Sequence, residues 1–581
     1  MLAAIQEERL SRIKNDSAFP ARAIRYCLDS QGMSPSDLDA IVFFEKPFLK
    51  FERIIESYFQ TAPFGFNSFR QSIPLWIGKK MFFKNLLRKE LKSVGVEALA
   101  KNQLLFSDHH LSHAACSFYP SGFEESAIVV VDAVGEWATS SIHHGKGKVI
   151  KELKVQHYPD SVGLLYSAFT QFLGFEVNSG EYKLMGLAPY GNRSNPNYCK
   201  YIKLINEHLV KIFADGSIKL NQKYFSYMTS LRMIPAKKWE GLFGLKKRTP
   251  NSPLSNDHSD LALAIQATVE DIILALARHA KALTGCSNIC VGGGVALNSV
   301  ANGKLLTSGH FKKVYIPFAP GDAGAAIGCA LAFAYTKQDS PQRFIAGQNS
   351  SPYLGPAFSD EEIEQSLEGL DVTYRIAADD ELFKFTAEQL YTGKIVGWFQ
   401  GRAEFGARAL GNRSILANPC LPEMQARLNH VIKNREGFRP FAPAILEEHM
   451  EETIGQPMHC PYMQYVLPIK HQLQIEPPKG YLSWTINQKL EFPKSIYPAV
   501  THVDFSARLQ TVRKIDNPRF HSLIESFHDL TNCPMLLNTS FNRNNEPIVN
   551  SPSDALECFS STEMDILVMN NFIVTKNNQY V

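Results

Sequence analysis

The sequence lacks the cysteine spacing on which zinc knuckles and small disulfide scaffolds depend. Ten cysteines occur among 581 residues and none forms a C-x-x-C pair, so neither class is indicated. No uncharged apolar run reaches the length of about 18 residues that a membrane span needs. The first residues, MLAAIQEERLSR, carry charge where a signal peptide is apolar. We therefore expect a cytoplasmic protein without a membrane span.

The sequence also lacks a surplus of charge of one sign. Lys plus Arg number 60 and Asp plus Glu number 57, a formal net charge of +3. A broad nucleic-acid surface needs a strong basic surplus, so we expect no nucleic-acid partner. Apolar residues make up 45% and charged residues 20% of the chain, the composition of a folded protein with buried cores. This length predicts roughly two to four domains.

Strand and helix patterns alternate over the first part of the chain, which predicts an α/β domain. Glycine-bounded apolar runs predict the strands, and a helical period over 261–284 predicts a helix that begins at Ser259 or Asp260 and stops at Gly285. The predicted strands are 126–131, the ATSSIHH segment that follows it, 288–291 and 313–317. Two further helices are predicted to begin at Asn298 and within PGDAGAAIGCALAFA. The small residues of the second helix predict that it packs closely against its neighbours.

The segment 336–358 is rich in proline, serine and glycine, which is typical of a boundary between domains. We place the boundary there, and 359–581 is predicted to form a second α/β domain. The sequence contains no short-period repeat and no low-complexity tract.

Three histidines lie within five residues in SDHHLSHAA (107–115). His109 and His113 are four residues apart, so on a helix they project from one face and can chelate a metal. The alternative is a polar first helical turn, capped by Ser107 or Asp108, that buries one satisfied histidine. The motif alone leaves both interpretations open.

Three further motifs combine a predicted strand end with glycine. In VVVDAVGEW (129–137), Asp132 ends a strand before a glycine turn, which suits a metal or a phosphate but also an ordinary hairpin. CVGGGVALN (290–298) joins a strand to a helix and can form an anion site, or it is simply a tight turn. In PGDAG (320–324), Asp322 either completes a metal site or caps its helix.

Basic residues are concentrated in the window 391–440, which holds eight of them against three acidic residues. Arginine forks bind phosphate and carboxylate oxygens in a bidentate manner, and the interleaved glycines allow a ligand to approach closely. The alternative is a solvated basic face. Together with LLNTSFN (536–542), the window predicts a pocket for a small phosphorylated substrate and ATP. The basic residues are Lys394, Arg402, Arg408, Arg413, Arg427, Lys433, Arg435 and Arg439.

Eight motifs occur in this order along the chain: HHLSHA, GEYKLMGLAPYG (180–191), GGGVALN, PGDAGAAIG, GRAEFGARALGNRS, KNREGFRPFAP, THVDFSARLQTV (501–512) and LLNTSFN. Together they resemble the O-carbamoyltransferase family of the nodulation and antibiotic-tailoring type. The resemblance covers nearly the whole chain. It implies an actin-like (ribonuclease-H-like, duplicated) ATPase domain over 1–350, similar to the tRNA threonylcarbamoyl transferase, and then a YrdC-like α/β domain over 351–581.

The resemblance implies an ATP-dependent transfer of a carbamoyl group from carbamoyl phosphate to a hydroxyl of a sugar-like or other secondary-metabolite acceptor. Carbamoyl phosphate and ATP would form carbamoyl-adenylate in the YrdC-like domain, with release of phosphate and pyrophosphate. The positions that match the family's catalytic residues for this step are Arg408, Lys433, Arg439, Arg508 and Ser540.

For the first domain, the resemblance implies a divalent metal, iron(II) by analogy, and an adenylate site. His109, His113, Asp132 and Asp322 would bind the metal, and Lys14 would touch the carbamoyl adduct. The residues that would line the adenylate are Asp132, Gly135, Glu136, Gly163, Gly294, Val295, Ala296, Leu297 and Asn298.

The sequence departs from the family pattern in two places. Relatives begin with a strand and a loop of the form N-x-x-H-D-x-S, well before the EER segment, and the histidine of this loop is their proposed general base. Here EER is Glu7 to Arg9, so that segment is missing, and we expect a start placed too late rather than a damaged copy. Tyr182 replaces a smaller residue and could reshape the acceptor pocket.

Three alternative functions match parts of the sequence. A hydrogenase-maturation carbamoyltransferase has the opposite domain order and C-x-x-C zinc fingers, which this sequence lacks. A threonylcarbamoyl-type tRNA-modifying enzyme predicts a basic tRNA surface, which the near-neutral charge disfavours. An N-terminally truncated, inactive homologue would act as a scaffold or a ligand sensor.

Overall fold

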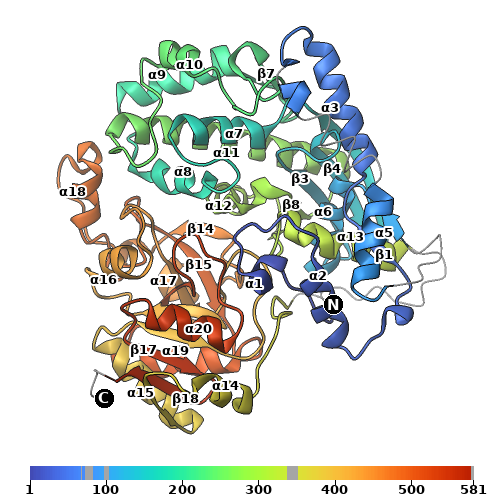
Figure 1. Cartoon of the computed structure of the whole chain (residues 1–581). Helices are drawn as coiled ribbons and strands as arrows, with labels where there is room; N and C mark the ends of the chain where they lie inside the picture. The colour runs from blue at the N-terminus through green and yellow to red at the C-terminus, as the bar shows by residue number, and fades with distance from the viewer. Residues whose placement is uncertain (67, 72–82, 97–103, 337–350, 578–581) are drawn as a thin grey trace. The chain divides into compact units, whose positions relative to one another are not determined.

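The structure is a computed structural model that describes residues 1–66, 68–71, 83–96, 104–336 and 351–577 (Figure 1). The chain folds into two compact units. The N-terminal unit is Ser34–Ser350, and the C-terminal unit combines Met1–Met33 with Ser351–Val581. Most of the predicted boundary segment 336–358 lies outside the described residues. Both units contain helices and sheets, so the mixed α/β class is confirmed.

The N-terminal unit is built on a five-stranded sheet in the order β5-β4-β3-β8-β9. Its central strand β3 is almost fully buried, because its apolar, β-branched run packs on both faces. It pairs antiparallel with β4 and parallel with β8, which confirms the predicted strands. The strands are β3 (Glu125–Val131), β4 (Ala138–Lys146), β5 (Val149–His157), β8 (Asn288–Gly292) and β9 (Lys313–Tyr315).

The long helix α11 (Asn256–Thr284) begins earlier than the sequence predicts. Its N-cap is Ser255, which forms a capping box with His258, so the expected caps Ser259 and Asp260 are wrong. Both lie buried inside the helix, where Asp260 accepts a hydrogen bond from the Asn192 amide at 2.7 Å. The predicted stop is confirmed, because Gly285 ends the helix in the left-handed conformation with φ 68°.

Helices α6 (His109–Phe118) and α13 (Asp322–Thr336) pack side by side (Figure 1). The small residues of α13 permit this, as the sequence predicts. A Cβ atom built on Gly328 would lie 1.8 Å from the carbonyl oxygen of Ser112 in α6. The close approach holds the two helices that carry the candidate metal ligands at a fixed separation.

The N-terminal unit contains further helices and strands. They are β1 (Ile41–Phe43), α3 (Pro47–Thr61), α5 (Phe83–Ser93), β2 (Leu104–Phe106), α7 (Val162–Phe172), α8 (Glu181–Leu187), α9 (Pro196–Leu204), β6 (Val210–Ile212), β7 (Ile218–Leu220), α10 (Ala236–Phe243) and α12 (Ser299–Thr307). The helix α12 starts directly after Asn298, as predicted.

The C-terminal unit contains a nine-stranded mixed sheet in the order β10-β18-β17-β11-β12-β16-β13-β15-β14. Its strands are β10 (Val372–Ile376), β11 (Val396–Phe399), β12 (Arg413–Ala417), β13 (Ala442–Leu446), β14 (Tyr465–Pro468), β15 (Ser506–Val512), β16 (Met535–Ser540), β17 (Ile566–Met569) and β18 (Phe572–Lys576). Its helices are α1 (Glu7–Ser11), α2 (Ala21–Asp29), α14 (Asp360–Leu367), α15 (Asp379–Tyr391), α16 (Met424–Arg427), α17 (Met450–Ile454), α18 (Ile486–Glu491), α19 (Pro518–Thr531) and α20 (Pro552–Ser560).

The first residues of the chain are anchored within the C-terminal unit. Arg9 is buried and donates from Nη2 to the carbonyl oxygen of Gly406 at 2.9 Å. Arg12 donates to the carbonyl oxygen of Ile548 at 2.7 Å and forms an ion pair with Asp554 at 3.4 Å. This N-terminal arm therefore supports the loop that leads to Arg408.

Within the described ranges, every helix is too short or too polar to cross a membrane.

The contact between α13 and α6 predicts that Gly328→Ala is destabilising. The added methyl forces the two helices apart, and we expect a loss of about 1–3 kcal/mol in the free energy of unfolding. Gly241→Ala in α10 is the control, because a Cβ there meets nothing within 4 Å and is expected to be neutral or to stabilise by up to about 1 kcal/mol. Urea denaturation measures both, and an equal stability of the two variants would contradict the packing.

Candidate metal centre and candidate anion site

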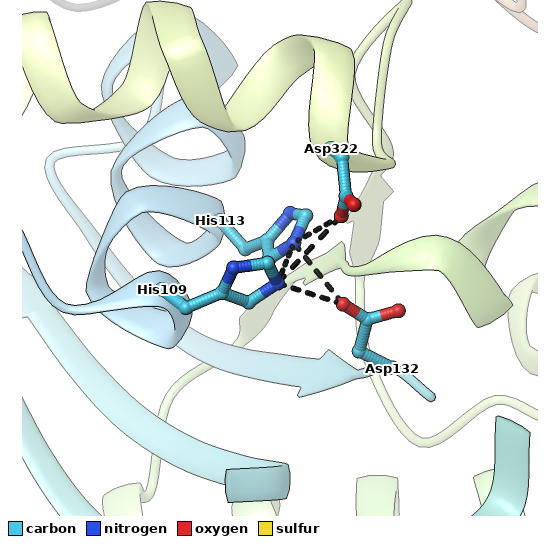
Figure 2. A group of neighbouring side chains, drawn as sticks. All are labelled: His109, His113, Asp132 and Asp322. Carbon is cyan, nitrogen blue, oxygen red and sulfur yellow. Dashed lines mark hydrogen bonds and ion pairs between the residues drawn. The ribbon is translucent and has the colours of Figure 1, made fainter. Parts of the chain in front are cut away.

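Four side chains from three parts of the N-terminal unit meet at one point (Figure 2). His109 and His113 project from the first two turns of α6, Asp132 follows the end of β3, and Asp322 begins α13. One ligand atom from each lies within 4.8 Å of the others. The sequence prediction that these four residues come together is therefore matched by the geometry.

The closest contacts in this group join the imidazoles to the carboxylates. His109 Nε2 lies 2.9 Å from Asp132 Oδ2 and 3.6 Å from Asp322 Oδ1. His113 Nε2 lies 3.4 Å from each of the same two oxygens. Both rings and Asp132 are buried, whereas the Asp322 side chain is 66% exposed. The group is thus open to solvent on the side of Asp322.

The electrostatics of this group favour a bound cation. Burial opposes a charge on His113, but the hydrogen bonds and charges of Asp132 and Asp322 outweigh it and raise the pKa of His113 to about 9. Burial likewise opposes ionisation of Asp132, and the two histidines still hold its pKa well below the usual value. In the absence of a metal, a proton on His113 therefore partly balances the negative charge of the carboxylates.

The hydrogen bonds of the two rings show which nitrogens can bind a metal. His113 Nδ1 lies 3.1 Å from the carbonyl oxygen of Pro320, so Nδ1 carries a hydrogen, and Nε2 is the nitrogen that offers a lone pair to a metal once its own proton has left. The Nε2 atoms of His109 and His113 are 3.1 Å apart, and His109 Nδ1 is buried without a partner. Two imidazoles and two carboxylates are a donor set that suits a divalent transition metal.

The glycines near the group allow its loops to approach one another. A Cβ on Gly163 would lie 2.7 Å from the backbone of Ala133, and one on Gly294 would lie 2.8 Å from Asp132 Oδ1. The Gly294 amide donates to this oxygen at 3.2 Å, and the Ala133 amide donates to it at 2.8 Å. A Cβ on Gly135 would lie 3.0 Å from the His109 ring. The three glycines thus surround the metal ligands.

Glu136 has a role that the sequence did not reveal. Its carboxylate accepts hydrogen bonds from the backbone amides of His109, at 3.2 Å, and of Lys46, at 2.7 Å. It therefore satisfies the first amide of α6, a task that the sequence assigned to Ser107 or Asp108. Asp108 stands at the N-cap position, but its side chain makes no capping hydrogen bond. Arg53, also unforeseen, donates to the Gly135 carbonyl oxygen at 2.7 Å.

The run after β8 forms a short 3-10 helix over Gly294–Leu297, which contains Val295 and Ala296. Asn298 then caps α12 by accepting from the Ala301 amide at 3.1 Å. Its side-chain amide also exchanges two hydrogen bonds of 3.0 Å with Gln266. Nothing in the sequence singles out Gln266, because it lies within the apolar period of α11.

Lys14, predicted to touch the carbamoyl adduct, belongs to the C-terminal unit. There its Nζ lies 3.7 Å from Glu8 Oε1, and its side chain is 44% exposed. The structure therefore does not place Lys14 in the compact unit that holds the four metal-ligand residues.

A second candidate site lies in the C-terminal unit around Lys433. The Lys433 ammonium is buried and donates to the backbone oxygens of Ser540 and Asn542, and it lies 3.4 Å from the Ser540 hydroxyl. Burial and the charges of Arg435 and Arg439 lower the pKa of Lys433 well below its usual value.

Arg508, on β15, belongs to the same cluster of cations. Burial and the charges of Arg408, Arg435 and Arg439 lower the pKa of Arg508 well below its usual value. Its Nε is buried without a hydrogen-bond partner. A carboxylate near the cluster, that of Glu436, lies 3.7 Å from Arg439. We define the cation cluster as the side chains of Lys433, Arg508, Arg408, Arg435 and Arg439, together with the Ser540 hydroxyl. Its excess of positive charge suits an anion with several oxygens.

The other basic residues of the window 391–440 have structural partners. Arg413 is fully buried, donates to five backbone carbonyl oxygens and lies 3.6 Å from the centre of the Phe399 ring. Arg402 donates to the carbonyl oxygens of residues 2, 354 and 355. Lys394 and Arg427 form ion pairs with Asp565 at 3.5 and 3.0 Å. The window therefore contains four members of the cation cluster and four cations with structural partners.

The capping by Glu136 predicts that Glu136→Ala lowers the stability of the N-terminal unit. The change leaves the His109 amide at the start of α6 and the Lys46 amide before α3 without this acceptor, and we expect a loss of about 1–3 kcal/mol in the free energy of unfolding. Asp108→Ala is the control. Asp108 makes an exposed ion pair with Lys46, whose loss is expected to cost less than about 1 kcal/mol. Urea denaturation compares the two, and a larger loss for Asp108→Ala would contradict the assignment.

Comparison with known proteins identifies the family. The model described as the N-terminus of carbamoyltransferases matches residues 1–331, and the model of their C-terminus matches residues 387–576. An uncharacterised protein of Synechocystis sp. is 46% identical over the whole chain and 94% of its own length. The nodulation protein NolNO of Sinorhizobium fredii is 35% identical over 99% of the chain and 77% of its own length.

A third relative, the nodulation protein NolO of Bradyrhizobium diazoefficiens, is 35% identical over 81% of the chain and 79% of its own length. The two family models and these three relatives together span both compact units. The chain belongs to the carbamoyltransferase family and is a carbamoyltransferase enzyme.

Proposed function

We propose that the enzyme transfers a carbamoyl group in two half-reactions, one in each compact unit. The C-terminal unit, as a YrdC-like domain, converts carbamoyl phosphate and ATP to carbamoyl-adenylate. The N-terminal unit, as an actin-like domain, transfers the carbamoyl group to a hydroxyl of a small sugar-like or secondary-metabolite acceptor. The observation that supports this most is the cation cluster, because an anion site with so many cations suits two phosphorylated substrates.

In the first half-reaction, the cation cluster holds the negative oxygens of both substrates. This half-reaction consumes one water molecule, because carbamoyl phosphate, ATP and water together give carbamoyl-adenylate, phosphate and pyrophosphate. Arg408, Arg439 and Arg508 orient the phosphate oxygens and offset the charge that develops on the departing groups. Ser540 is the last residue of β16, and the Lys433 ammonium lies beside its hydroxyl. The bound anion removes the electrostatic repulsion that lowers the pKa of Lys433 and Arg508.

In the second half-reaction, the residues around Asp132 bind the adenylate. The glycine run after β8 brings the backbone close to Asp132, and Gly163 and Gly294 leave room for the adenylate to approach the backbone. The acceptor oxygen attacks the carbamoyl carbon, AMP leaves, and the proton of the hydroxyl is released. The products are the carbamoylated acceptor and AMP.

The four residues His109, His113, Asp132 and Asp322 fit a divalent metal, and iron(II) agrees with the donor set. When bound, such an ion orients the adenylate phosphate and polarises the leaving group. The protein's own contribution is to keep both Nε2 atoms facing the two carboxylates. The hydrogen bond from His113 Nδ1 to Pro320 fixes the ring, and Glu136 fixes the start of α6.

Pyrophosphate release tests the first half-reaction. Purified full-length protein with ATP and metal is expected to release pyrophosphate when carbamoyl phosphate is added. Arg508→Ala should lower this release at least a hundredfold, because a bidentate partner of the developing charge is lost and such groups contribute roughly 10²–10³ in rate.

Lys394→Ala is the matched control for this test. It removes another cation of the same window, one that is 45% exposed and pairs with Asp565, so pyrophosphate release should persist. If folded wild-type protein releases no pyrophosphate, or if Arg508→Ala retains full release, the proposed adenylate-forming site is wrong.

Metal binding tests the N-terminal unit separately. Because His113 must lose its proton to bind a metal and its pKa is raised to about 9, the metal affinity of chelator-treated protein should rise with pH until about 9. Titration calorimetry with iron(II) under anaerobic conditions, or with manganese(II), measures this.

His113→Ala should weaken metal binding by more than the roughly 10–100-fold caused by loss of an outer-shell partner. The same variant should retain carbamoyl-phosphate-dependent pyrophosphate release, because its cation cluster is intact. Metal affinity that is unchanged in His113→Ala would rule out this centre.

A further inference from the structure

A second group of metal-binding side chains lies at the opposite end of β3 from Asp132. Glu125 begins β3, His144 lies near the end of β4, and Cys286 follows the end of α11. A carboxylate oxygen, an imidazole nitrogen and the thiol sulfur of these residues all lie within 4.8 Å of one another. At about 3.3 Å per residue of strand, this group is roughly 20 Å from Asp132.

The contacts within this group link two strands and a turn. His144 Nε2 lies 2.9 Å from Glu125 Oε1, and Lys146 Nζ lies 3.3 Å from the same oxygen. The Cys286 thiol is buried and contacts the carbonyl oxygen of Thr284 at 3.8 Å. Cys286 is held in turn by Lys281, whose ammonium donates to its carbonyl oxygen at 2.5 Å.

An ion pair explains only part of this arrangement. Glu125, His144 and Lys146 form a partly exposed ion-pair network at one end of the inner strands β3 and β4, but this network does not account for the position of the Cys286 thiol. Cysteine, histidine and glutamate together are ligands that zinc prefers, and three protein ligands leave a fourth tetrahedral position for water. Glu125 is 43% and His144 28% exposed, so an ion and a water molecule can reach them.

We propose that Glu125, His144 and Cys286 form a second metal site, which binds zinc or another thiophilic divalent cation. Binding forms a metal–sulfur bond and releases the thiol proton to solvent. The Lys146 side chain, which is 70% exposed, turns away from Glu125 as the cation takes its place. The proposal is independent of the proposed two half-reactions.

The position of this site indicates a structural role. The ion would join the start of β3, the end of β4 and the turn between α11 and β8. The same two parallel strands, β3 and β8, carry Asp132 and the glycine run at their other ends. A metal here would therefore hold the register of the strands that position the candidate catalytic centre.

Cobalt(II) distinguishes the second site from the first, because only the second contains a thiolate. Cobalt(II) added to metal-free, reduced full-length protein should produce a sulfur-to-metal charge-transfer band. The band should be absent in Cys286→Ser and at least halved in His144→Ala. It should persist in Cys199→Ser, which removes an exposed cysteine, and in His109→Ala, which removes a ligand of the first centre.

A second measurement covers the possibility that a variant is poorly folded. Zinc should raise the midpoint of thermal unfolding of the single variant His109→Ala. It should not raise the midpoint of the double variant His109→Ala/Glu125→Gln. The carboxamide of the Glu125→Gln substitution keeps the shape of the glutamate side chain but removes its charge. A charge-transfer band that survives in Cys286→Ser, the absence of any band in folded wild-type protein, or an equal zinc shift in the two proteins would overturn the proposal.

Discussion

The buried carboxylate of Asp132 is the constraint on which the N-terminal unit depends. A buried charge is tolerated only when it is paired and hydrogen-bonded, and Asp132 meets this need with two histidines and two backbone amides. These partners come from three segments: α6 supplies both rings, the loop after β3 supplies one amide, and the run after β8 supplies the other. The carboxylate thus fixes where these segments meet.

Much of this arrangement can be predicted from local pattern. The spacing of His109 and His113, the apolar run of β3 and the glycine at the end of α11 all act over a few residues, and these predictions match the structure. The cap of α6 cannot be predicted in this way. Its acceptor, Glu136, lies 27 residues further along the chain, and only the folded hairpin brings it to the helix start.

The basic residues of the C-terminal unit show the same limit. Composition marks the window 391–440, but it cannot separate Arg408 from Arg413, which is only five residues away. Arg413 is satisfied by backbone carbonyl oxygens and an aromatic ring, whereas Arg408 adds its charge to the cluster around Arg508. What distinguishes them is the set of groups around each side chain, and these groups come from parts of the chain far apart in the sequence.

The division of the chain has a consequence for synthesis. Because Met1–Met33 belong to the same compact unit as Ser351–Val581, residues made before the N-terminal unit have their contacts among residues made after it. Arg9 has no Gly406 to bind until some 400 further residues have been made, while the N-terminal unit between them can already fold. The segment Met1–Met33 is therefore among the last to reach its native position, and cutting the gene at residue 350 would separate it from the rest of the C-terminal unit while leaving Ser34–Ser350 whole.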